Sequence, residues 1–254
     1  DVVVRYAKGS NLIGDAAIEE RATMFGKSIG RDNRTEDEMM AEAIEIAKSS
    51  DVIIAAMGET AEFSGESASR TNLDIPDVQK TLLMELMKLG KPVVLVLFAG
   101  RPLTLNWEQA NVPAILDVWF GGSEAGYSIP DVLFGDVNPS GKLTTTFPQN
   151  VGQIPIYYNH KNTGRPLPEG KWFQKFRSNY LDVSNDPLYP FGYGLSYTIF
   201  EYGKLKVSSD KLKGAQTLTA SIEVKNTGKV DGKEIVQLYI RDMVGTVTRP
   251  VKEL

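Results

Sequence analysis

Asp51-Val-Ile-Ile-Ala-Ala-Met57 is a short apolar run, and the next stretch reads Gly58-Glu-Thr-Ala-Glu-Phe-Ser-Gly-Glu-Ser-Ala-Ser-Arg70. The length and β-branched content of the run predict a buried strand. The Gly- and Ser-rich stretch predicts a loop that carries three carboxylates and a guanidinium. In open α/β sheets, the loops that leave the carboxyl ends of strands are where ligands bind. We therefore expect one of these carboxylates to take part in chemistry, although an acidic loop can also be simply a solvated surface.

On either side of this stretch, strands and helices are predicted to alternate as far as about residue 147. The expected strands are 2–6, 52–57, 93–98 and 114–120, and the expected helices are 35–49, 75–87 and 123–134. Near-continuous apolar runs such as 93–98 are typical of parallel strands that are covered on both faces. The pattern predicts an α/β fold: a doubly wound, mostly parallel sheet with helices on both faces, incomplete at its N-terminus.

Several residues mark where these helices should begin and end. Thr35 followed by Glu38 is the pattern of a capping box. Gly90 is in the position that favours a left-handed cap after the second helix. Ser123 is expected to cap the third helix, and Pro130 is expected to kink or break it.

Beyond Pro148 the pattern changes. Residues 151–197 are dense in Pro, Gly and aromatic side chains, which predicts a long loop packed on the rest of the protein rather than disorder. Residues 201–207, 218–225 and 235–240 alternate with a period of two, which predicts strands of a partial antiparallel β-sandwich. The sequence is thus divided into an α/β domain at 1–150, a connecting loop at 151–197 and a partial sandwich at 198–254.

The composition excludes several classes of function. A net charge of -4 from 28 basic and 32 acidic residues gives no basic surface for nucleic acid or an anionic membrane. The absence of cysteine excludes disulfides and thiolate chemistry, and a single histidine, His160, excludes a multi-histidine metal site. We expect no cofactor and no metal. No run of apolar residues approaches the length needed to span a bilayer, so no membrane partner is predicted.

Six stretches occur together in an order that resembles glycoside hydrolase family 3, and most closely its periplasmic β-glucosidases. They are Gly58-Glu59, Ser64-Gly-Glu-Ser-Ala-Ser-Arg70, Gly90-Lys-Pro-Val-Val-Leu-Val96, Gly121-Gly-Ser-Glu-Ala-Gly126, Leu133-Phe-Gly-Asp-Val-Asn-Pro-Ser-Gly-Lys-Leu143 and Pro190-Phe-Gly-Tyr-Gly-Leu-Ser-Tyr197. The resemblance covers essentially the whole chain. It implies an α/β sandwich domain followed by a truncated fibronectin type III-like domain, with an N-terminal barrel domain of the same parent chain as a partner.

The same resemblance implies a retaining β-glycosidase with two carboxylates about 5 to 5.5 Å apart. The family's nucleophile lies in a barrel segment Ser-Asp-Trp, which does not occur here, since Ser50-Asp51 precedes Val52. The acid/base is placed at Glu66 by resemblance. Glu59 and Glu62 are its rivals and, with Arg70 and Trp172, are candidates for substrate binding or loop positioning. Pairing of Arg70 with Glu66 would lower the pKa of Glu66 and oppose an acid role, so we expect Arg70 to pair elsewhere.

Other signals have simpler explanations. Gly121-Gly-Ser-Glu-Ala-Gly126 lacks the spacing of a phosphate-binding loop and is predicted to be a tight turn. His160 is expected on the surface or hydrogen-bonded within its loop, and Asp182 and Asp186 are as readily turn residues as ligands. For Trp172, packing of the long loop against its own domain is favoured over stacking on a sugar ring.

Together these features predict the C-terminal part of a β-glucosidase-like enzyme that acts on a β-linked glucoside or oligosaccharide. The part supplies the acid/base, lacks the nucleophile and should be inactive alone. The alternative is a non-catalytic carbohydrate-binding or assembly module. By resemblance only, the protein is expected to be periplasmic or extracellular.

Overall fold

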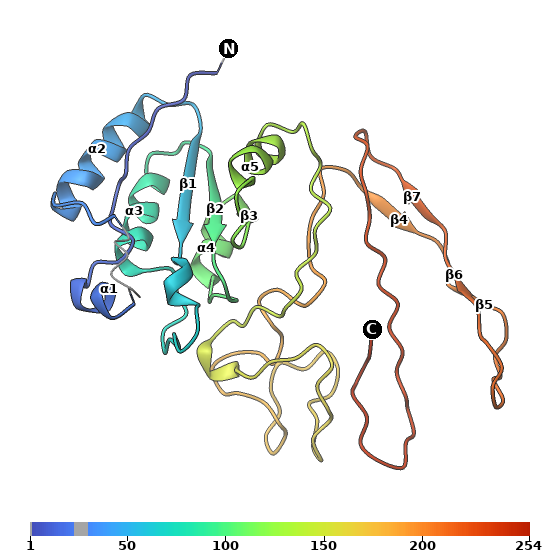
Figure 1. Cartoon of the computed structure of the whole chain (residues 1–254). Coiled ribbons are helices and arrows are strands. Elements are labelled where there is room, and N and C mark those ends of the chain that lie inside the picture. The colour runs from blue at the N-terminus through green and yellow to red at the C-terminus, as the bar shows by residue number, and fades with distance from the viewer. Residues whose placement is uncertain (1, 23–29) are drawn as a thin grey trace.

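The computed structural model describes residues 2–22 and 30–254. Its centre is a parallel sheet of three strands in the order β1 (Ile53–Gly58), β2 (Val93–Phe98) and β3 (Ala114–Asp117). Ile53 lies opposite Val93, and Val94 lies opposite Ala114. Because all three strands run the same way, their carboxyl ends meet at one edge of the sheet, at the lower end in Figure 1.

Helices flank this sheet (Figure 1): α2 (Glu36–Lys48) and α3 (Asp77–Met87) lie beside β1, and α5 (Ala125–Leu133) lies beyond β3. Two short helices, α1 (Ala16–Ala22) and α4 (Asn106–Asn111), were not predicted, because neither is long enough to show a clear apolar period. The predicted α/β class with a parallel sheet is confirmed.

The hydrophobic core lies between the sheet and its helices. Four leucines and valines of β2 are among its most enclosed members, with Val93, Leu95 and Leu97 at 0% exposure. Leu83 of α3 and Phe147 pack in the same cluster. The near-continuous apolar run of β2 thus lies buried, as its sequence predicts.

The predicted boundaries of α2 and α3 are confirmed. The side chain of Thr35 accepts a hydrogen bond from the Glu38 amide, and the Glu38 side chain accepts one from the Thr35 amide, so the capping box is complete. Gly90 has φ +66, the left-handed conformation expected after the end of α3.

The structure contradicts the predicted cap of α5 at Ser123 and, for Pro130, the predicted break but not the alternative of a kink. Its N-cap is Glu124, which makes no side-chain capping bond, and Ser123 therefore does not cap the helix. Pro130 lies inside α5 and does not break it. A proline has no backbone N–H to donate. Pro130, the sixth residue of α5, therefore removes one hydrogen bond from this nine-residue helix without ending it.

The predicted strand at residues 2–6 is not observed. Val2, Val3 and Val4 are 70%, 80% and 82% exposed and do not belong to a described strand. β-branched residues favour a strand only when a neighbouring strand pairs with it and covers one face. None of the described strands does so for this run.

The C-terminal part forms two short antiparallel ladders that share one ribbon (Figure 1): β4 (Phe200–Tyr202) pairs with β7 (Val224–Asn226), and β5 (Lys206–Val207) pairs with β6 (Ala220–Ser221). The predicted strand at 235–240 is reduced to a single bridge between Ile240 and Glu253. The antiparallel pairing is as predicted, but within 201–254 no residue is buried, so alternating side chains there have no second sheet to cover them.

The long segment between these parts has little regular structure beyond η2 (Val151–Gln153). It is joined to the α/β part by an antiparallel bridge between Phe147 and Tyr189. The ring of Tyr158 stacks on Phe191 with centroids 4.5 Å apart, so part of its aromatic content is packed as expected.

Candidate active site

The candidate site is the loop that follows β1 at the carboxyl edge of the sheet. The chain leaves β1 at Gly58, passes through the short helix η1 (Ala61–Phe63) and turns at residues 65–68 before it reaches Arg70. Gly58 is required at the start, since a Cβ on it would lie 1.8 Å from the carbonyl oxygen of Phe98. The chain turns sharply as it leaves β1, and Glu59 therefore lies at the carboxyl edge of the sheet.

Glu59 is the most enclosed of the three loop carboxylates, with a side chain 0% exposed. Its Oε1 accepts a short hydrogen bond from Arg70 Nη1, and its Oε2 lies 3.3 Å from Arg101 Nε. A buried carboxylate needs such partners, because the loss of hydration is offset only by opposite charge close by. Glu59 therefore has a structural position between two guanidinium groups.

Glu66 is placed very differently. It is exposed, at the corner of a turn closed by a 3.2 Å hydrogen bond from the Ala68 amide to the Gly65 carbonyl. The next residue, Ser67, has φ +61, a left-handed conformation that is uncommon for residues other than glycine. Among the described residues, no basic side chain forms an ion pair with Glu66.

The remaining predicted site residues lie as follows. Glu62 is half-buried in η1. Arg70 pairs with Glu59 and not with Glu66, as we expected, and its guanidinium carbon is 5.8 Å from the centre of the Phe63 ring. Trp172 is 54% exposed, and the centre of its ring lies 6.4 Å from that of the neighbouring Phe173. His160 is exposed, as expected.

Two residues at this edge were missed by the sequence analysis. Arg101 follows β2, and its Nη2 donates to the carbonyl oxygens of Phe63 and Ala68, the latter at 2.7 Å. Asp117 ends β3, where burial raises its pKa to about 6 against a weaker lowering by the Trp119 amide. In the sequence, the signals that could have found them were Arg101, a basic residue just after the apolar run 93–98, and Asp117, the single carboxylate inside the run 114–120.

A second polar cluster is formed by side chains of α3, α4 and the segments next to them. Glu108 of α4 is 0% exposed, burial raises its pKa, and Lys80 Nζ is 3.6 Å from its Oε1. Lys80 also lies 3.7 Å from Asp74 Oδ2, and Asp74 accepts a hydrogen bond from Thr104. This cluster ties α3 to α4 and is not part of the loop that carries Glu66.

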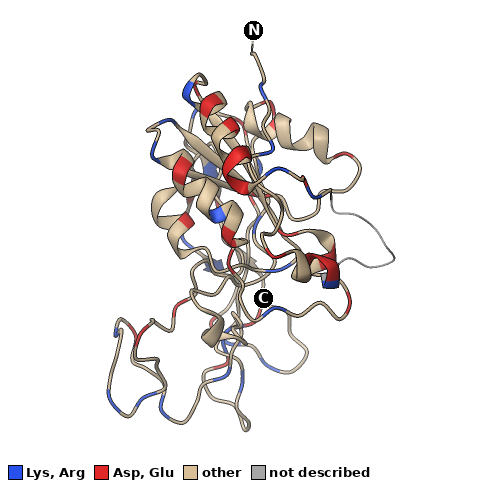
Figure 2. Cartoon of the chain, turned by 90° about the vertical axis from the view of Figure 1, so that its left-hand side faces the viewer, with Lys and Arg blue, Asp and Glu red and all other residues tan. Residues whose placement is uncertain are grey.

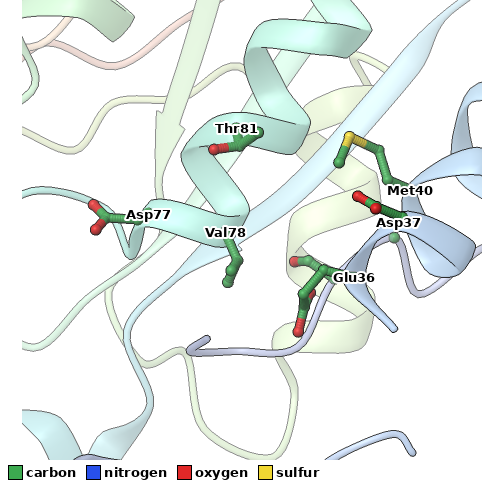
Figure 3. A pocket seen from close by; sticks show the side chains of 8 residues that line it. Glu36, Asp37, Met40, Asp77, Val78 and Thr81 are labelled. Carbon is green, nitrogen blue, oxygen red and sulfur yellow. The ribbon is translucent and has the colours of Figure 1, made fainter. Parts of the chain in front are cut away.

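The structure also has a hollow of about 210 Å³ between α2 and α3. Figure 3 shows Glu36, Asp37 and Met40 facing Val78 and Thr81 across it. The Glu36 carboxylate is already hydrogen-bonded to Asn11, whose side-chain Nδ2 donates to Glu36 Oε1 at 2.8 Å. The hollow lies among the helices and contains none of the predicted site residues.

Charge is distributed unevenly over the chain. Figure 2 shows Asp and Glu gathered on the helices of the α/β part, with Lys and Arg scattered over loops. Within 2–22 and 30–254, no three His, Cys, Asp or Glu side chains are grouped so as to hold a metal ion. No helix of the same described ranges is long and apolar enough to cross a membrane.

A parallel α/β sheet with an exposed carboxylate on a loop at its carboxyl edge defines the class as an α/β domain with a candidate acid/base site. The model of the family described as Glycosyl hydrolase family 3 C-terminal domain matches residues 5–197. The chain belongs to this family.

Similar proteins agree with this assignment. The periplasmic beta-glucosidase of Salmonella typhimurium is 47% identical over 251 residues, which are 99% of this chain and 33% of that protein. A beta-xylosidase of Formosa agariphila is 44% identical over 84% of this chain and 28% of its own length. The crystal structure of a beta-glucosidase from Listeria innocua in complex with gluconolactone has a TM-score of 0.81 and 41% identity, and covers 87% of this chain and 30% of that one. The chain thus spans about a third of the length of these relatives.

Proposed function

We propose that the chain is the C-terminal part of a retaining β-glycosidase of the β-glucosidase type, in which Glu66 is the general acid/base. The observation that carries the proposal is the position of Glu66. It projects from a turn at the carboxyl edge of the sheet, exposed and free of any ion pair with the described residues, while Glu59 is engaged by two arginines. Of the three loop carboxylates, Glu66 is the most exposed and therefore the best placed to meet a substrate presented by another domain.

The chemistry requires two carboxylates. In a retaining glycosidase, one carboxylic acid protonates the leaving oxygen while a carboxylate attacks the anomeric carbon, and the first group then deprotonates the water that releases the sugar. Glu66 takes the proton-transfer role in this proposal. The nucleophile comes from a barrel domain of the parent chain, since the family segment Ser-Asp-Trp does not occur in these residues.

The proposal includes the remaining predictions about the site and its setting. The α/β unit at 1–150, the connecting loop at 151–197 and the partial fibronectin type III-like part at 198–254 form one C-terminal assembly. Glu62, Glu59, Arg70 and Trp172 bind substrate or position the loop, and the half-exposed ring of Trp172 is free to stack on a sugar face. The substrate is a β-linked glucoside or oligosaccharide, and the enzyme is periplasmic or extracellular.

The test uses the full-length protein and the variants Glu66→Ala and Glu62→Ala. Protonation matters most for a poor leaving group, so Glu66→Ala should lose about 10²- to 10⁴-fold in kcat on an alkyl β-glucoside. The loss on a 2,4-dinitrophenyl β-glucoside should be much smaller, and added azide should restore turnover of that substrate as a glucosyl azide. Glu62→Ala, at a residue that binds substrate or positions the loop, should lower kcat/KM on both substrates to a similar extent and should give no glucosyl azide.

Equal losses on both substrates, with no azide product, would place the acid/base elsewhere. A second measurement concerns the 254-residue chain alone, which should not turn over the activated aryl glucoside. If neither the full-length protein nor any variant hydrolysed glucosides while the protein bound oligosaccharides, the alternative of a non-catalytic carbohydrate-binding module would replace the proposal.

A further inference from the structure

Arg101, which lies just after β2, contacts the loop after β1 at three points. Its Nε lies 3.3 Å from Oε2 of Glu59, at the end of β1. Its Nη2 donates to the carbonyl oxygens of Phe63 and Ala68 in the loop, and Arg101 itself follows β2. The side chain is 21% exposed, so these contacts are made largely out of water, where hydrogen bonds to a charged group are strong.

The two loop carbonyls that Arg101 binds lie on either side of Glu66. Phe63 precedes it by three residues and Ala68 follows it by two. Because Arg101 holds both carbonyls, only the short stretch 64–67 between them is free to move. Among the described residues, Arg101 forms hydrogen bonds or ion pairs with Phe63, Ala68 and Glu59 and not with Glu66, so its effect on Glu66 acts through the backbone.

Further contacts hold the two ends of the loop and its first residues. Arg70 also binds Glu59 and donates to the Asp74 carbonyl at 3.3 Å. The side chain of Ser64 lies against Gly100, because a Cβ added to Gly100 would be 2.0 Å from Ser64 Oγ. Glu59 forms ion pairs with both Arg70 and Arg101 and so holds the two guanidinium groups in place.

We propose that Arg101 is a positioning residue for general acid/base catalysis, with Glu59 as its anchor. This inference rests on the proposed function of Glu66. A group that transfers a proton must lie within hydrogen-bond reach of the glycosidic oxygen, and a displacement of 1 Å can cost about 10²-fold in rate. Arginine suits the role because its planar guanidinium donates to the two loop carbonyls in fixed directions while it forms an ion pair with Glu59, which a lysine ammonium cannot reproduce.

The experiment compares Arg101→Gln and Arg101→Lys with Arg34→Gln in the full-length protein. Arg34 is the control, since it is likewise an ion-paired arginine, bound to Asp32 and Glu42, but lies on an exposed surface away from the loop. Arg101→Gln should lower kcat on an alkyl β-glucoside by about 10²-fold and on the 2,4-dinitrophenyl substrate by less than about fivefold. Arg34→Gln should change neither.

Arg101→Lys keeps a positive charge beside Glu59 and guards against loss of folding. It should keep the thermal midpoint of the parent protein and still show the selective loss on the poor leaving group. The third measurement combines Arg101→Gln with Glu66→Ala. If Arg101 acts through Glu66, the double variant should be no slower on the alkyl glucoside than Glu66→Ala alone, within about threefold.

Equal losses on both substrates, additive losses in the double variant, or full activity of Arg101→Lys would each overturn the positioning role. Failure of the proposed function is seen separately, in the single variant Glu66→Ala. Should that variant lose activity equally on both substrates, the acid/base assignment fails and the inference about Arg101 fails with it.

Discussion

At the scale of single residues, the carboxylate of Glu59 has the environment that should matter most for folding. Its side chain is fully enclosed and faces Arg70 and Arg101. Both guanidinium groups are themselves only 20% and 21% exposed, so they have little water to replace a lost partner. The pair of ion contacts is therefore worth more than a surface pair, whose contribution is commonly below about 1 kcal/mol.

Replacing Glu59 by Gln should lower the free energy of unfolding by about 3 kcal/mol, because two partly buried cations lose their counter-charge. Chemical denaturation of the 254-residue chain measures this value. The control is Glu85→Gln, which removes the exposed ion pair with Lys88 and should cost less than about 0.5 kcal/mol. A loss for Glu59→Gln as small as that of the control would show that the enclosed network adds nothing to stability.

Asp117 should produce a pH dependence of the opposite sign to that of a salt-bridged carboxylate. Burial raises its pKa from 3.8 to about 6, so the folded chain binds a proton that the unfolded chain has released between these values. Stability from this group is present at low pH and is lost as the pH rises through about 6. The shift corresponds to at most about 3 kcal/mol, and partial exposure reduces the expected effect to about 1 kcal/mol.

Asp117→Asn should therefore raise the free energy of unfolding by about 1 kcal/mol at pH 7.5 and leave it almost unchanged at pH 4. The measurement is the difference between variant and parent at each pH, which cancels the titration of other groups. A constant difference across this range would mean that Asp117 does not titrate as its burial indicates.

At the scale of elements, the loop that carries Glu66 rests on the end of β2. Gly100 allows Ser64 and the ring of Phe120 to approach its backbone, since an added Cβ would lie 2.0 Å from Ser64 Oγ and 2.7 Å from Phe120 Cε2. A side chain here would push the loop away from the sheet. The contact links the end of one strand to the geometry of the loop that leaves its neighbour.

Gly100→Ala should accordingly lower the kcat of the full-length protein on an alkyl β-glucoside about tenfold or more, by moving the loop. Adding Ser64→Gly, which removes one of the two clashing side chains, should recover part of the loss. Gly126→Ala is the matched control, because nothing lies within 4 Å of a Cβ added there and its φ is not positive. If the control lost as much activity, a general effect of removing glycine would explain both.

The elements also show how far the sequence could predict this structure. The capping box of Thr35 and Glu38, the glycine after α3 and the apolar run of β2 depend on local patterns, and all three are confirmed. Residues 2–6 and 235–240 have equally good strand patterns, but strand formation requires a partner that local pattern does not specify. The capping role given to Ser123 failed by one residue, as helix boundaries often do.

The candidate site was predictable in part for the same reason. A loop after a buried strand could be expected to carry chemistry, and its carboxylates could be named. The contact between Glu59 and Arg101 spans 42 positions and depends on the pairing of β1 with β2, which brings the two strand ends together. No local pattern in either segment encodes that distance.

At the scale of the whole molecule, burial is concentrated in the α/β part. The hydrophobic core cluster extends from Ala43 to Phe147, while no residue of 201–254 is buried. The C-terminal part is joined to the rest by polar contacts such as Lys142 to Glu234 at 3.3 Å and Asn138 to the Asp231 carbonyl at 3.0 Å. Its strands are two or three residues long, below the length at which an isolated ribbon is stable in water.

The two parts should therefore differ in stability within the 254-residue chain. Amide hydrogens of β2 should exchange only through global unfolding, while those of 201–254 should exchange through local opening that costs little free energy. The same contrast applies to matched leucines. Leu95→Ala, at a position with 0% exposure, should lower the free energy of unfolding of the α/β part by about 2–5 kcal/mol, whereas Leu218→Ala, at 41% exposure, should leave it within about 0.5 kcal/mol. Equal protection of both parts, or a large loss from Leu218→Ala, would mean that the C-terminal ribbon and the sheet fold as one cooperative unit despite the lack of a shared core.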